Sequence, residues 1–221
     1  MFDTGSYFSL EGQTAIVTGG TTGLGLAITR CMVGAGAKVA VLSYESREQG
    51  REALKEFGGK AVFYQFDITD TDHTQEMADR VIAEQGPVTI LVNNAGNHCK
   101  KYIEDMTVED YVNVLNVHLV GAFALTKALF PHMKEQGKGS ILFQASMTSA
   151  KGEGRRCRTA CQQAQAAALI KSDDVMGRAK AYEAIVKGDN LFRVRLYQLL
   201  RTTPYLPKYI YSSSVLSWRI S

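Results

Sequence analysis

The sequence contains few of the residues that cross-link or interrupt a chain. Among its 221 residues are only four cysteines, four prolines and one tryptophan. No two cysteines form a C-x-x-C pair, and Cys157 and Cys161 have no nearby histidine, so we expect neither a disulfide scaffold nor a metal site. The low proline count and the 45% hydrophobic content exclude a disordered or collagen-like chain.

Signals for export or for membrane insertion are also missing. Residues 1–10 contain neither a basic stretch nor the apolar core of a secretory signal. No run approaches about 18 apolar residues, so we expect no membrane-spanning helix and no membrane partner. The sequence therefore predicts a cytoplasmic protein with reduced thiols.

The net charge is only +3, but it is unevenly distributed. Residues 1–150 contain 12 Lys and Arg against 17 Asp and Glu, whereas residues 151–221 contain 13 against 5. A basic tail can bind nucleic acid, yet these arginines are scattered and no aromatic residues are interleaved with them as a stacking surface. We expect no nucleic-acid partner and interpret the asymmetry as a join between two stretches of different origin.

The first 150 residues alternate between short apolar runs and helical patterns, which is typical of βαβ units. The expected strands are residues 14–18, 38–42, 61–66, 88–92 and 140–145. The expected helices are residues 25–34, 45–57, 71–85 and 108–136, the last broken only at Pro131. This pattern predicts an α/β fold with a Rossmann-type, doubly wound parallel sheet of strand order 3-2-1-4-5.

Residues 151–221 lack this rhythm. Residues 159–187 are Ala-rich enough to favour helix, while Pro204 and Pro207 prevent a long element further on. We therefore expect an NAD(P)-binding Rossmann domain over residues 1–150, followed by an aberrant basic tail that is partly helical and not an independent domain. With the C-terminal part truncated or irregular, the fifth strand would leave an open sheet edge.

A glycine-rich turn, TGGTTGLG over residues 18–25, follows the first expected strand. Gly19 permits a tight turn, Gly23 lets the backbone approach a pyrophosphate, and Gly25 allows close packing of helix on strand. Phosphates would bind at the helix N-terminus, where free N–H groups and the helix dipole favour anions. The expected cofactor site also includes Thr21, Thr22 and Leu24.

Together with NNAG at residues 93–96 and Ser146 after the fifth strand, this T-G-x3-G-x-G turn resembles the short-chain dehydrogenase/reductase family. Residues 94–136 are similar to gluconate 5-dehydrogenase-like reductases of sugar acids and polyols, and the resemblance covers about residues 8–150. It implies an NAD(P)-dependent oxidoreductase with a small carbonyl or alcohol substrate. It also implies a homo-oligomer formed through residues 108–136, whose interface the altered tail can compromise.

The resemblance assigns further roles by position. Ser146 would hydrogen-bond the substrate oxygen and polarise it in the transition state. His118 stands at a catalytic position that is usually asparagine, where it either holds a water of a proton relay or is a satisfied polar residue of the core. Residues beside the cofactor would be Asp67 and Ile68, which flank the adenine, and Asn94, Ala95 and Gly96, which brace the central strand.

The choice between NAD and NADP depends on the end of the second expected strand, where an acidic residue would bind the ribose hydroxyls of NAD. Ser43 stands at that position. Ser43 and Arg47 would accept a 2′-phosphate, whereas Glu45 would serve a ribose. Both cofactors stay open, with a slight preference for NADP.

The family's Tyr-x-x-x-Lys pair is absent. In the family, the tyrosine transfers the hydroxyl proton, and the lysine lowers its pKa and binds the ribose. Counting 13 residues from Ser146 finds Thr159 and Gln163 at the two positions, and counting 15 finds Cys161 and Gln165. None of the ten tyrosines has a lysine four residues later. We expect an impaired or inactive enzyme, with a non-catalytic cofactor-binding domain as the alternative.

Residues 171–190 (KSDDVMGRAKAYEAIVKGDN) are similar to the C-terminal region of the bacterial RNA polymerase β subunit. The segment is too short to carry a polymerase site. It favours a chimeric or frameshifted reading frame joined near Ala150, without stable function, over a natural divergent tail.

Overall fold

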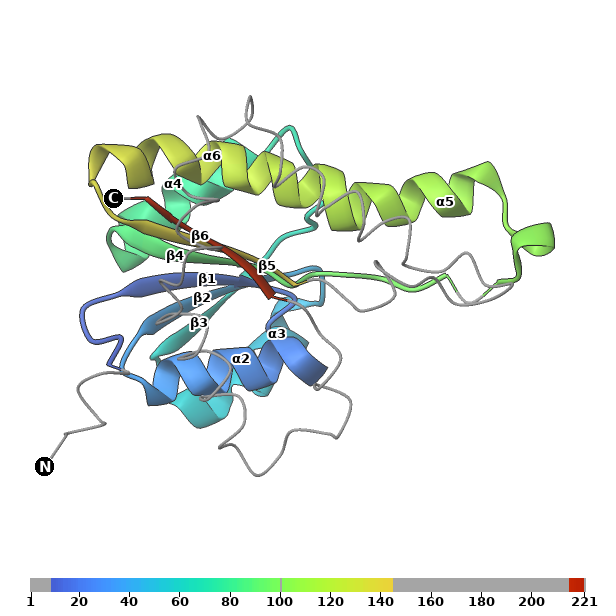
Figure 1. The fold of residues 1–221 in the computed structure, drawn as a ribbon. Coiled ribbons are helices and arrows are strands. Elements are labelled where there is room, and N and C mark those ends of the chain that lie inside the picture. The colour runs from blue at the N-terminus through green and yellow to red at the C-terminus, as the bar shows by residue number, and fades with distance from the viewer. Residues whose placement is uncertain (1–8, 100, 145–214, 221) are drawn as a thin grey trace, which may run out of the picture.

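The computed structural model describes residues 9–99, 101–144 and 215–220, which form one six-stranded sheet (Figure 1). The sheet order is β3-β2-β1-β4-β5-β6, and β1 to β5 pair in parallel. This confirms the expected Rossmann-type α/β fold and the order of its first five strands. The strands are β1 Thr14–Thr18, β2 Lys38–Ser43, β3 Ala61–Gln65, β4 Val88–Asn93, β5 Gly139–Gln144 and β6 Val215–Ile220.

Helices cover both faces of the sheet, as a doubly wound fold requires (Figure 1). Helices α2 (Gly23–Gly34) and α3 (Arg47–Leu54) lie on one face, and α4 (Thr74–Gln85) and α6 (Ala122–Glu135) lie on the other. The remaining helical elements are η1 (Lys55–Phe57), η2 (Ile103–Asp105), α5 (Val108–Leu115) and η3 (Asn116–Gly121), a π-helix.

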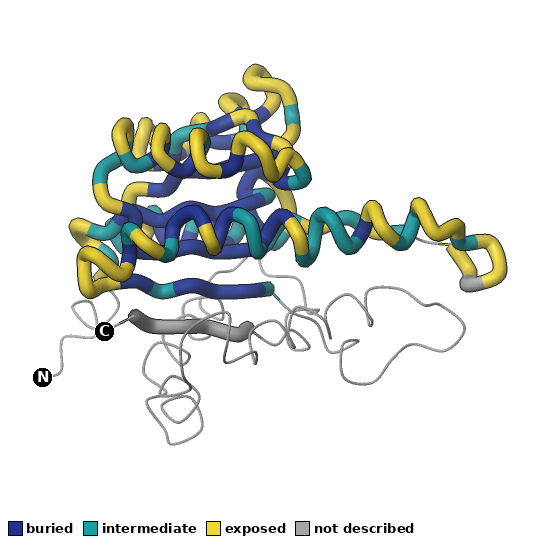
Figure 2. Tube along the Cα trace, turned by 90° about the horizontal axis from the view of Figure 1, so that it is seen from above, coloured by how far each residue is buried: buried dark blue, intermediate teal, exposed yellow. Residues whose placement is uncertain are grey.

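Two hydrophobic clusters fill the space between the sheet and its helices. Successive residues of β1 enter opposite clusters: Ile16 packs on the side of α4 and α6, and Ala15 and Val17 pack on the side of α2. All five residues of β1 are buried, and Figure 2 shows the buried strands at the centre of the molecule. Burial on both faces explains why the strands have nearly continuous apolar sequences.

Side-chain caps fix where two helices begin. Ser46 accepts a hydrogen bond from the Gln49 N–H and so starts α3 at Arg47, slightly later than the sequence pattern predicts. Thr107 and Asp110 form the same reciprocal cap at the start of α5. The hydrogen bond from Lys101, with those from Thr107, lowers the pKa of Asp110 to about 2.

The long helix expected over residues 108–136 is not broken at Pro131, so that prediction is wrong. Helix α6 continues through Pro131 to Glu135. Proline removes one backbone donor, but its fixed φ is compatible with a helix, and the fully buried Leu129 and Met133 hold this segment on the sheet. The helix changes instead at η3, where six residues adopt the wider π form.

The expectation of an open edge at the fifth strand is also wrong. β6 pairs antiparallel with β5, from Gly139 opposite Ile220 to Gln144 opposite Val215, and lies beside it in Figure 1. An unpaired edge exposes a row of N–H and C=O groups, and a short strand with β-branched and aromatic residues satisfies them. The helix expected over residues 159–187 lies outside the described residues.

One helix of the described residues is long and apolar enough to cross a membrane, although the sequence was expected to contain no such segment. This helix is Val108–Glu135, formed by α5, η3 and α6, and it meets the requirement by length and composition alone. One third of its apolar window, 33%, is buried, and α6 packs on the sheet through Leu125, Leu129 and Met133. The helix is therefore a partly buried core helix of an α/β domain.

Truncating the α6 core contact will measure how much the helix contributes to stability. Leu129 is fully buried, so Leu129→Ala is expected to lower the free energy of unfolding by about 2–5 kcal/mol. Val108→Ala, at a position 79% exposed on the same helix, is expected to change it by no more than about 0.5 kcal/mol. Urea denaturation followed by circular dichroism measures both, and equal losses would contradict the packing described.

Candidate cofactor site

Close backbone contacts shape the turn between β1 and α2. Gly19 has a φ of 63°, in the left-handed region that favours glycine. A Cβ atom on Gly25 would overlap the carbonyl oxygen of Gly19 and would lie 2.6 Å from the side-chain nitrogen of Asn94. Gly23 has a φ of 51° and no atom within 4 Å of its Cβ position. The turn is thus tight toward the protein and open at Gly23.

The N-terminus of α2 presents backbone donors. Thr22 is the N-cap residue, but its side chain makes no capping hydrogen bond. The first N–H groups of a helix have no partner within the helix, and the helix dipole places partial positive charge at the same end. Free N–H groups and the dipole together make this end of α2 suited to an anion such as a phosphate.

Asn94 joins the end of β4 to the end of β1. Its side-chain nitrogen donates to the carbonyl oxygens of Thr18, at 3.0 Å, and Gly19, at 3.2 Å. The backbone N–H groups of Asn94 and Ala95 both donate to the Thr18 hydroxyl. These bonds fix the glycine turn relative to the central strands.

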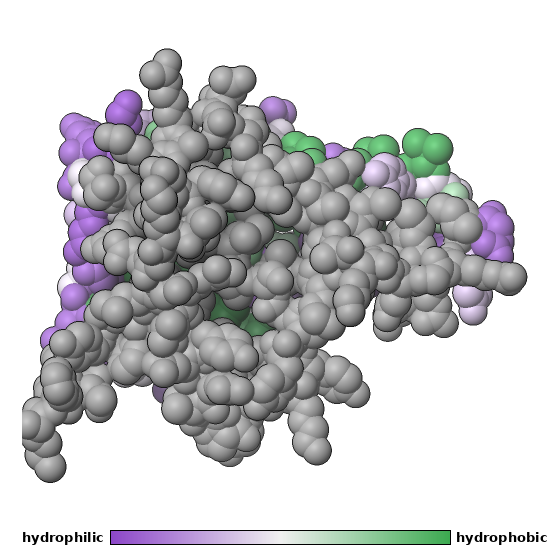
Figure 3. Space-filling view, viewed as in Figure 1, coloured by the Kyte–Doolittle hydropathy of each residue, from purple (hydrophilic) through white to green (hydrophobic). Residues whose placement is uncertain are grey.

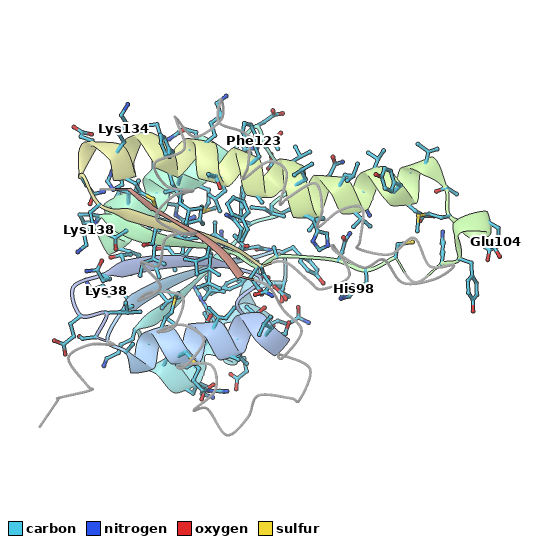
Figure 4. The ribbon with its side chains drawn as sticks, in the orientation of Figure 1. Lys38, His98, Glu104, Phe123, Lys134 and Lys138 are labelled. Atoms are coloured by element: carbon cyan, nitrogen blue, oxygen red, sulfur yellow. The ribbon has the colours of Figure 1, made fainter. Side chains whose placement is uncertain are left out.

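A cavity of about 590 Å³ lies where the carboxyl ends of β1 to β4 meet. Figure 4 places His98, one of its lining residues, at this side of the molecule, and Lys38, Lys134 and Lys138 at the opposite end. Most expected cofactor residues line this cavity: Gly19, Thr22, Gly23, Leu24, Gly25, Ser43, Asp67, Ile68, Asn94, Ala95 and Gly96.

Several lining residues were missed by the sequence reasoning. Most follow a strand end by a few residues, so extending each expected strand end would have found them. Asn113 and Val117 come instead from the helical segment α5 and η3. Their spacing of four residues, which places them on one face of a helix, was the one sequence signal for them. The missed lining residues are Leu42, Tyr44, Phe66, Thr69, Asn97, His98, Asn113 and Val117, whereas Glu45, which was expected to serve a ribose, also lines the cavity.

Two expected cofactor residues, Thr21 and Arg47, do not line the cavity. Thr21 is buried, and its hydroxyl donates to Oε1 of Glu45 at 2.8 Å. Arg47 is exposed and begins α3. The other carboxylate oxygen of Glu45, Oε2, is buried without a hydrogen-bond partner in the part of the chain that the structure describes.

The loop after β3 is held by local hydrogen bonds. Oδ1 of Asp67 accepts from the N–H of Thr69, at 2.9 Å, and from its hydroxyl, at 2.8 Å. A Cβ atom on Gly121 would overlap the carbonyl oxygen of Ile68, so η3 packs directly on this loop. These contacts fix the wall of the cavity formed by Asp67 to Thr69.

His118 supports the cavity from η3 but is not among its lining residues. Its Nε2 lies 2.9 Å from the carbonyl oxygen and 3.1 Å from the backbone nitrogen of Asn97, which does line the cavity. Burial lowers the pKa of the His118 imidazole, so the neutral ring is favoured. The ring has a backbone partner, as a satisfied polar residue would, and a role in a proton relay stays a prediction.

The other expected catalytic positions, Ser146, Thr159, Cys161, Gln163 and Gln165, lie outside the described residues. Within residues 9–99, 101–144 and 215–220, no group of three or more His, Cys, Asp or Glu side chains could hold a metal ion.

A comparison with family models matches residues 13–175 to the short chain dehydrogenases. The chain belongs to the short-chain dehydrogenase family. The match continues 25 residues beyond residue 150, where the sequence resemblance was expected to end. No finding supports the RNA polymerase resemblance of residues 171–190, which also lie outside the described residues.

Family relatives differ in substrate. The chain is 34% identical over 148 residues to the 2-dehydro-3-deoxy-D-gluconate 5-dehydrogenase of Formosa agariphila, covering 66% of this chain and 56% of that protein. It is 40% identical over 139 residues to the NADP-dependent (R)-specific alcohol dehydrogenase of Lentilactobacillus kefiri, covering 62% and 55%. The chain thus spans just over half the length of these two relatives.

A solved structure has the same fold. The gluconate 5-dehydrogenase of Burkholderia cenocepacia, crystallised with NADP and tartrate, superposes with a TM-score of 0.71 at 26% sequence identity. The superposition covers 76% of this chain and 67% of that one. The architecture built from the strands and the glycine turn is therefore that of a known dehydrogenase.

The close packing around Gly25 predicts that a side chain at this position weakens nucleotide binding. Gly25→Ala would push α2 away from the turn, so we expect the Kd for NADH and NADPH to rise at least tenfold in a fluorescence titration. Gly34→Ala is the matched control, because no atom lies within 4 Å of the Gly34 Cβ position, at the other end of the same helix. Unchanged binding by Gly25→Ala would contradict the site.

The partial burial of His118 predicts a pH dependence of stability. Because its pKa is lower in the folded than in the unfolded state, the unfolded chain binds the proton first, and stability falls as pH drops below about 6.5. His118→Asn is therefore expected to show a smaller loss of unfolding free energy between pH 7.5 and pH 5.5 than the unchanged protein.

His73 provides a control of opposite sign. The exposed His73 pairs with Asp70, which raises the pKa of the imidazole, so its contribution is present at low pH and is lost as pH rises. His73→Gln is expected to make the acid loss slightly larger. Chemical denaturation at the two pH values measures both variants, and an unchanged pH dependence in His118→Asn would contradict a partly buried, neutral imidazole.

Proposed function

We propose that this chain binds a nicotinamide dinucleotide at the carboxyl ends of β1 to β4 and derives from oxidoreductases that transfer hydride between this cofactor and a small ketone or alcohol. One observation carries the proposal: a cavity of about 590 Å³ is lined by the glycine turn and by the residues that follow β2, β3 and β4. In an open α/β sheet, ligands bind at this edge.

The residues present fit such a cofactor. The uncapped N-terminus of α2 and the open space at Gly23 would accept the pyrophosphate. Asp67 and Ile68 would flank the adenine, and the segment Asn94 to Gly96 would lie beside the nicotinamide half. Ser43 and Glu45 stand where the adenosine ribose would lie, so either NAD or NADP is proposed at this point.

We propose a sugar acid, a polyol or a related ketone and alcohol pair as the substrate class. The relatives named for 2-dehydro-3-deoxy-D-gluconate and for alcohols support it. The bound cofactor would supply or accept a hydride. Ser146 would donate a hydrogen bond to the substrate oxygen and stabilise the charge that develops on it.

The missing Tyr-x-x-x-Lys pair supports a second candidate, a domain that binds the cofactor without turning it over. A positioned general acid or base contributes about 10²–10⁴-fold to rate, and the lysine of the family also binds the ribose. With Thr159 and Gln163, or Cys161 and Gln165, at these positions, neither a phenol nor an ammonium group is supplied. We therefore propose slow or absent turnover with cofactor binding retained.

The homo-oligomer implied by the family resemblance stays a prediction. Apolar side chains of helix Val108–Glu135 support it, because Val108, Val112 and Val120 are exposed. Figure 3 shows hydrophobic surface along the part of the molecule where Figure 1 places α5.

Binding and turnover separate these candidates. We expect saturable quenching or enhancement of NADH or NADPH fluorescence, with little or no oxidation of the reduced cofactor in the presence of keto-gluconates. If the missing pair limits turnover, Thr159→Tyr with Gln163→Lys, or Cys161→Tyr with Gln165→Lys, is expected to raise the rate by about 10²–10⁴-fold. If the unchanged chain binds neither nucleotide saturably, the proposed function is contradicted.

A further inference from the structure

The segment that follows β4 brings a histidine to one end of the cavity. His98 comes five residues after Asn93, the last residue of β4, and its exposed side chain lines the cavity. β4 lies on one side of β1, and β2 and β3, which Glu45 and Asp67 follow, lie on the other. His98 therefore lies toward the end of the cavity away from these carboxylates, where the chain runs out to α5 (Figure 4).

Contacts with η3 hold the backbone that leads to His98. The Nε2 atom of His118 lies within hydrogen-bond distance of both the N–H and the carbonyl group of Asn97. A Cβ atom on Gly96 would overlap the His118 ring, so the chain packs directly on η3 at this point. His98 thus extends from a fixed stretch of backbone, and a ligand that binds it does not have to order this stretch first.

His98 is the one side chain among the described lining residues that can carry a positive charge. Lys101, three residues later, does not line the cavity, and its ammonium nitrogen is 2.6 Å from Oδ2 of Asp110. A charged imidazole donates from both ring nitrogens, whereas a carboxylate can only accept. This end of the cavity is therefore suited to a small anion such as a carboxylate.

His118, the other imidazole beside this segment, does not supply the charge. Burial is the main cause that lowers the pKa of His118, and the charge of His98 lowers it further, so the neutral His118 ring is favoured. Because the charge of His98 acts on His118, the two imidazoles lie close enough to interact. Of the two, His98 is the one that presents its charge to the cavity.

From this placement we infer that His98 binds the carboxylate of an acidic substrate and makes the site prefer a sugar acid to the neutral polyol of the same length. The inference rests on the proposed function and selects one of its substrate classes. Asn113 of α5 also lines the cavity, and its amide can donate to or accept from hydroxyl groups of either compound, so it does not discriminate between them. His98 acts in binding alone and takes no part in the transfer of hydride or proton.

Binding of D-gluconate and D-glucitol to the full chain, saturated with NADH or NADPH, tests the inference. The two compounds have the same number of carbons and differ at one end, where gluconate has a carboxylate and glucitol a hydroxymethyl group. Neither contains a ketone that the reduced cofactor could reduce, so calorimetric titration measures binding without turnover. At about pH 6, where an exposed imidazole is partly protonated, we expect gluconate to bind more tightly than glucitol by about threefold or more.

Substitutions at the exposed His98 change the charge of the cavity without altering the core. His98→Gln is expected to remove the preference for gluconate, His98→Glu to reverse it, and His98→Arg to retain it. The Kd values for glucitol and for the nucleotide are expected to stay unchanged in all three variants. His73→Gln is the matched control, because it removes an exposed imidazole that does not line the cavity and is expected to keep the preference.

The titrations separate failure of the inference from failure of the proposed function. If a reduced nucleotide binds but gluconate binds no more tightly than glucitol, or does not bind, the inference is overturned and the proposed function survives. A preference for gluconate that persists in His98→Gln and His98→Glu overturns the role of His98. If neither NADH nor NADPH binds, the proposed function fails and the inference fails with it.

Discussion

The site depends on how closely α2 approaches the end of β1. A Cβ atom on Gly25 would overlap the carbonyl group of Gly19, and Asn94 donates to the carbonyl oxygens of Thr18 and Gly19, where the turn leaves β1. Any side chain at Gly25 would separate the helix from the strand. Because this contact fixes the N-terminus of α2, it also fixes the direction in which the free N–H groups and the helix dipole point. An anion-binding position therefore follows from backbone packing.

The parallel sheet adds the rest of the cavity. Parallel strands place all their carboxyl ends at one edge, so residues distant in sequence, such as Thr21, Glu45 and Asp67, meet there. Charge is also distributed along this axis, since Lys38, Lys134 and Lys138 lie at the opposite end of the sheet (Figure 4). Among the described lining residues, the N-terminus of α2 thus supplies partial positive charge, and Glu45 and Asp67 are the carboxylates.

The order of the first five strands and most of the cavity lining were predictable from sequence, because apolar β-rich runs and a glycine turn are local signals. Two of the expected cofactor residues lie outside the lining: Arg47 is exposed at the start of α3, and the Thr21 hydroxyl donates to Glu45, a contact that no local sequence pattern indicates. Their roles toward the cofactor stay predictions. β6 was missed because its pairing with β5 bridges more than 70 residues. The π-helix at His118 has no simple sequence signal.

Hydrogen–deuterium exchange with and without saturating NADH tests the central claim, that the edge formed by the glycine turn and the strand ends is a nucleotide site. The account predicts slower exchange in residues 19–25, 43–45 and 94–97, the segments that contain most of the residues lining the cavity. Residues 125–135 of α6, on the far side of the sheet from α2, would exchange as before. Unchanged exchange in the three cavity segments, with protection elsewhere, would contradict it.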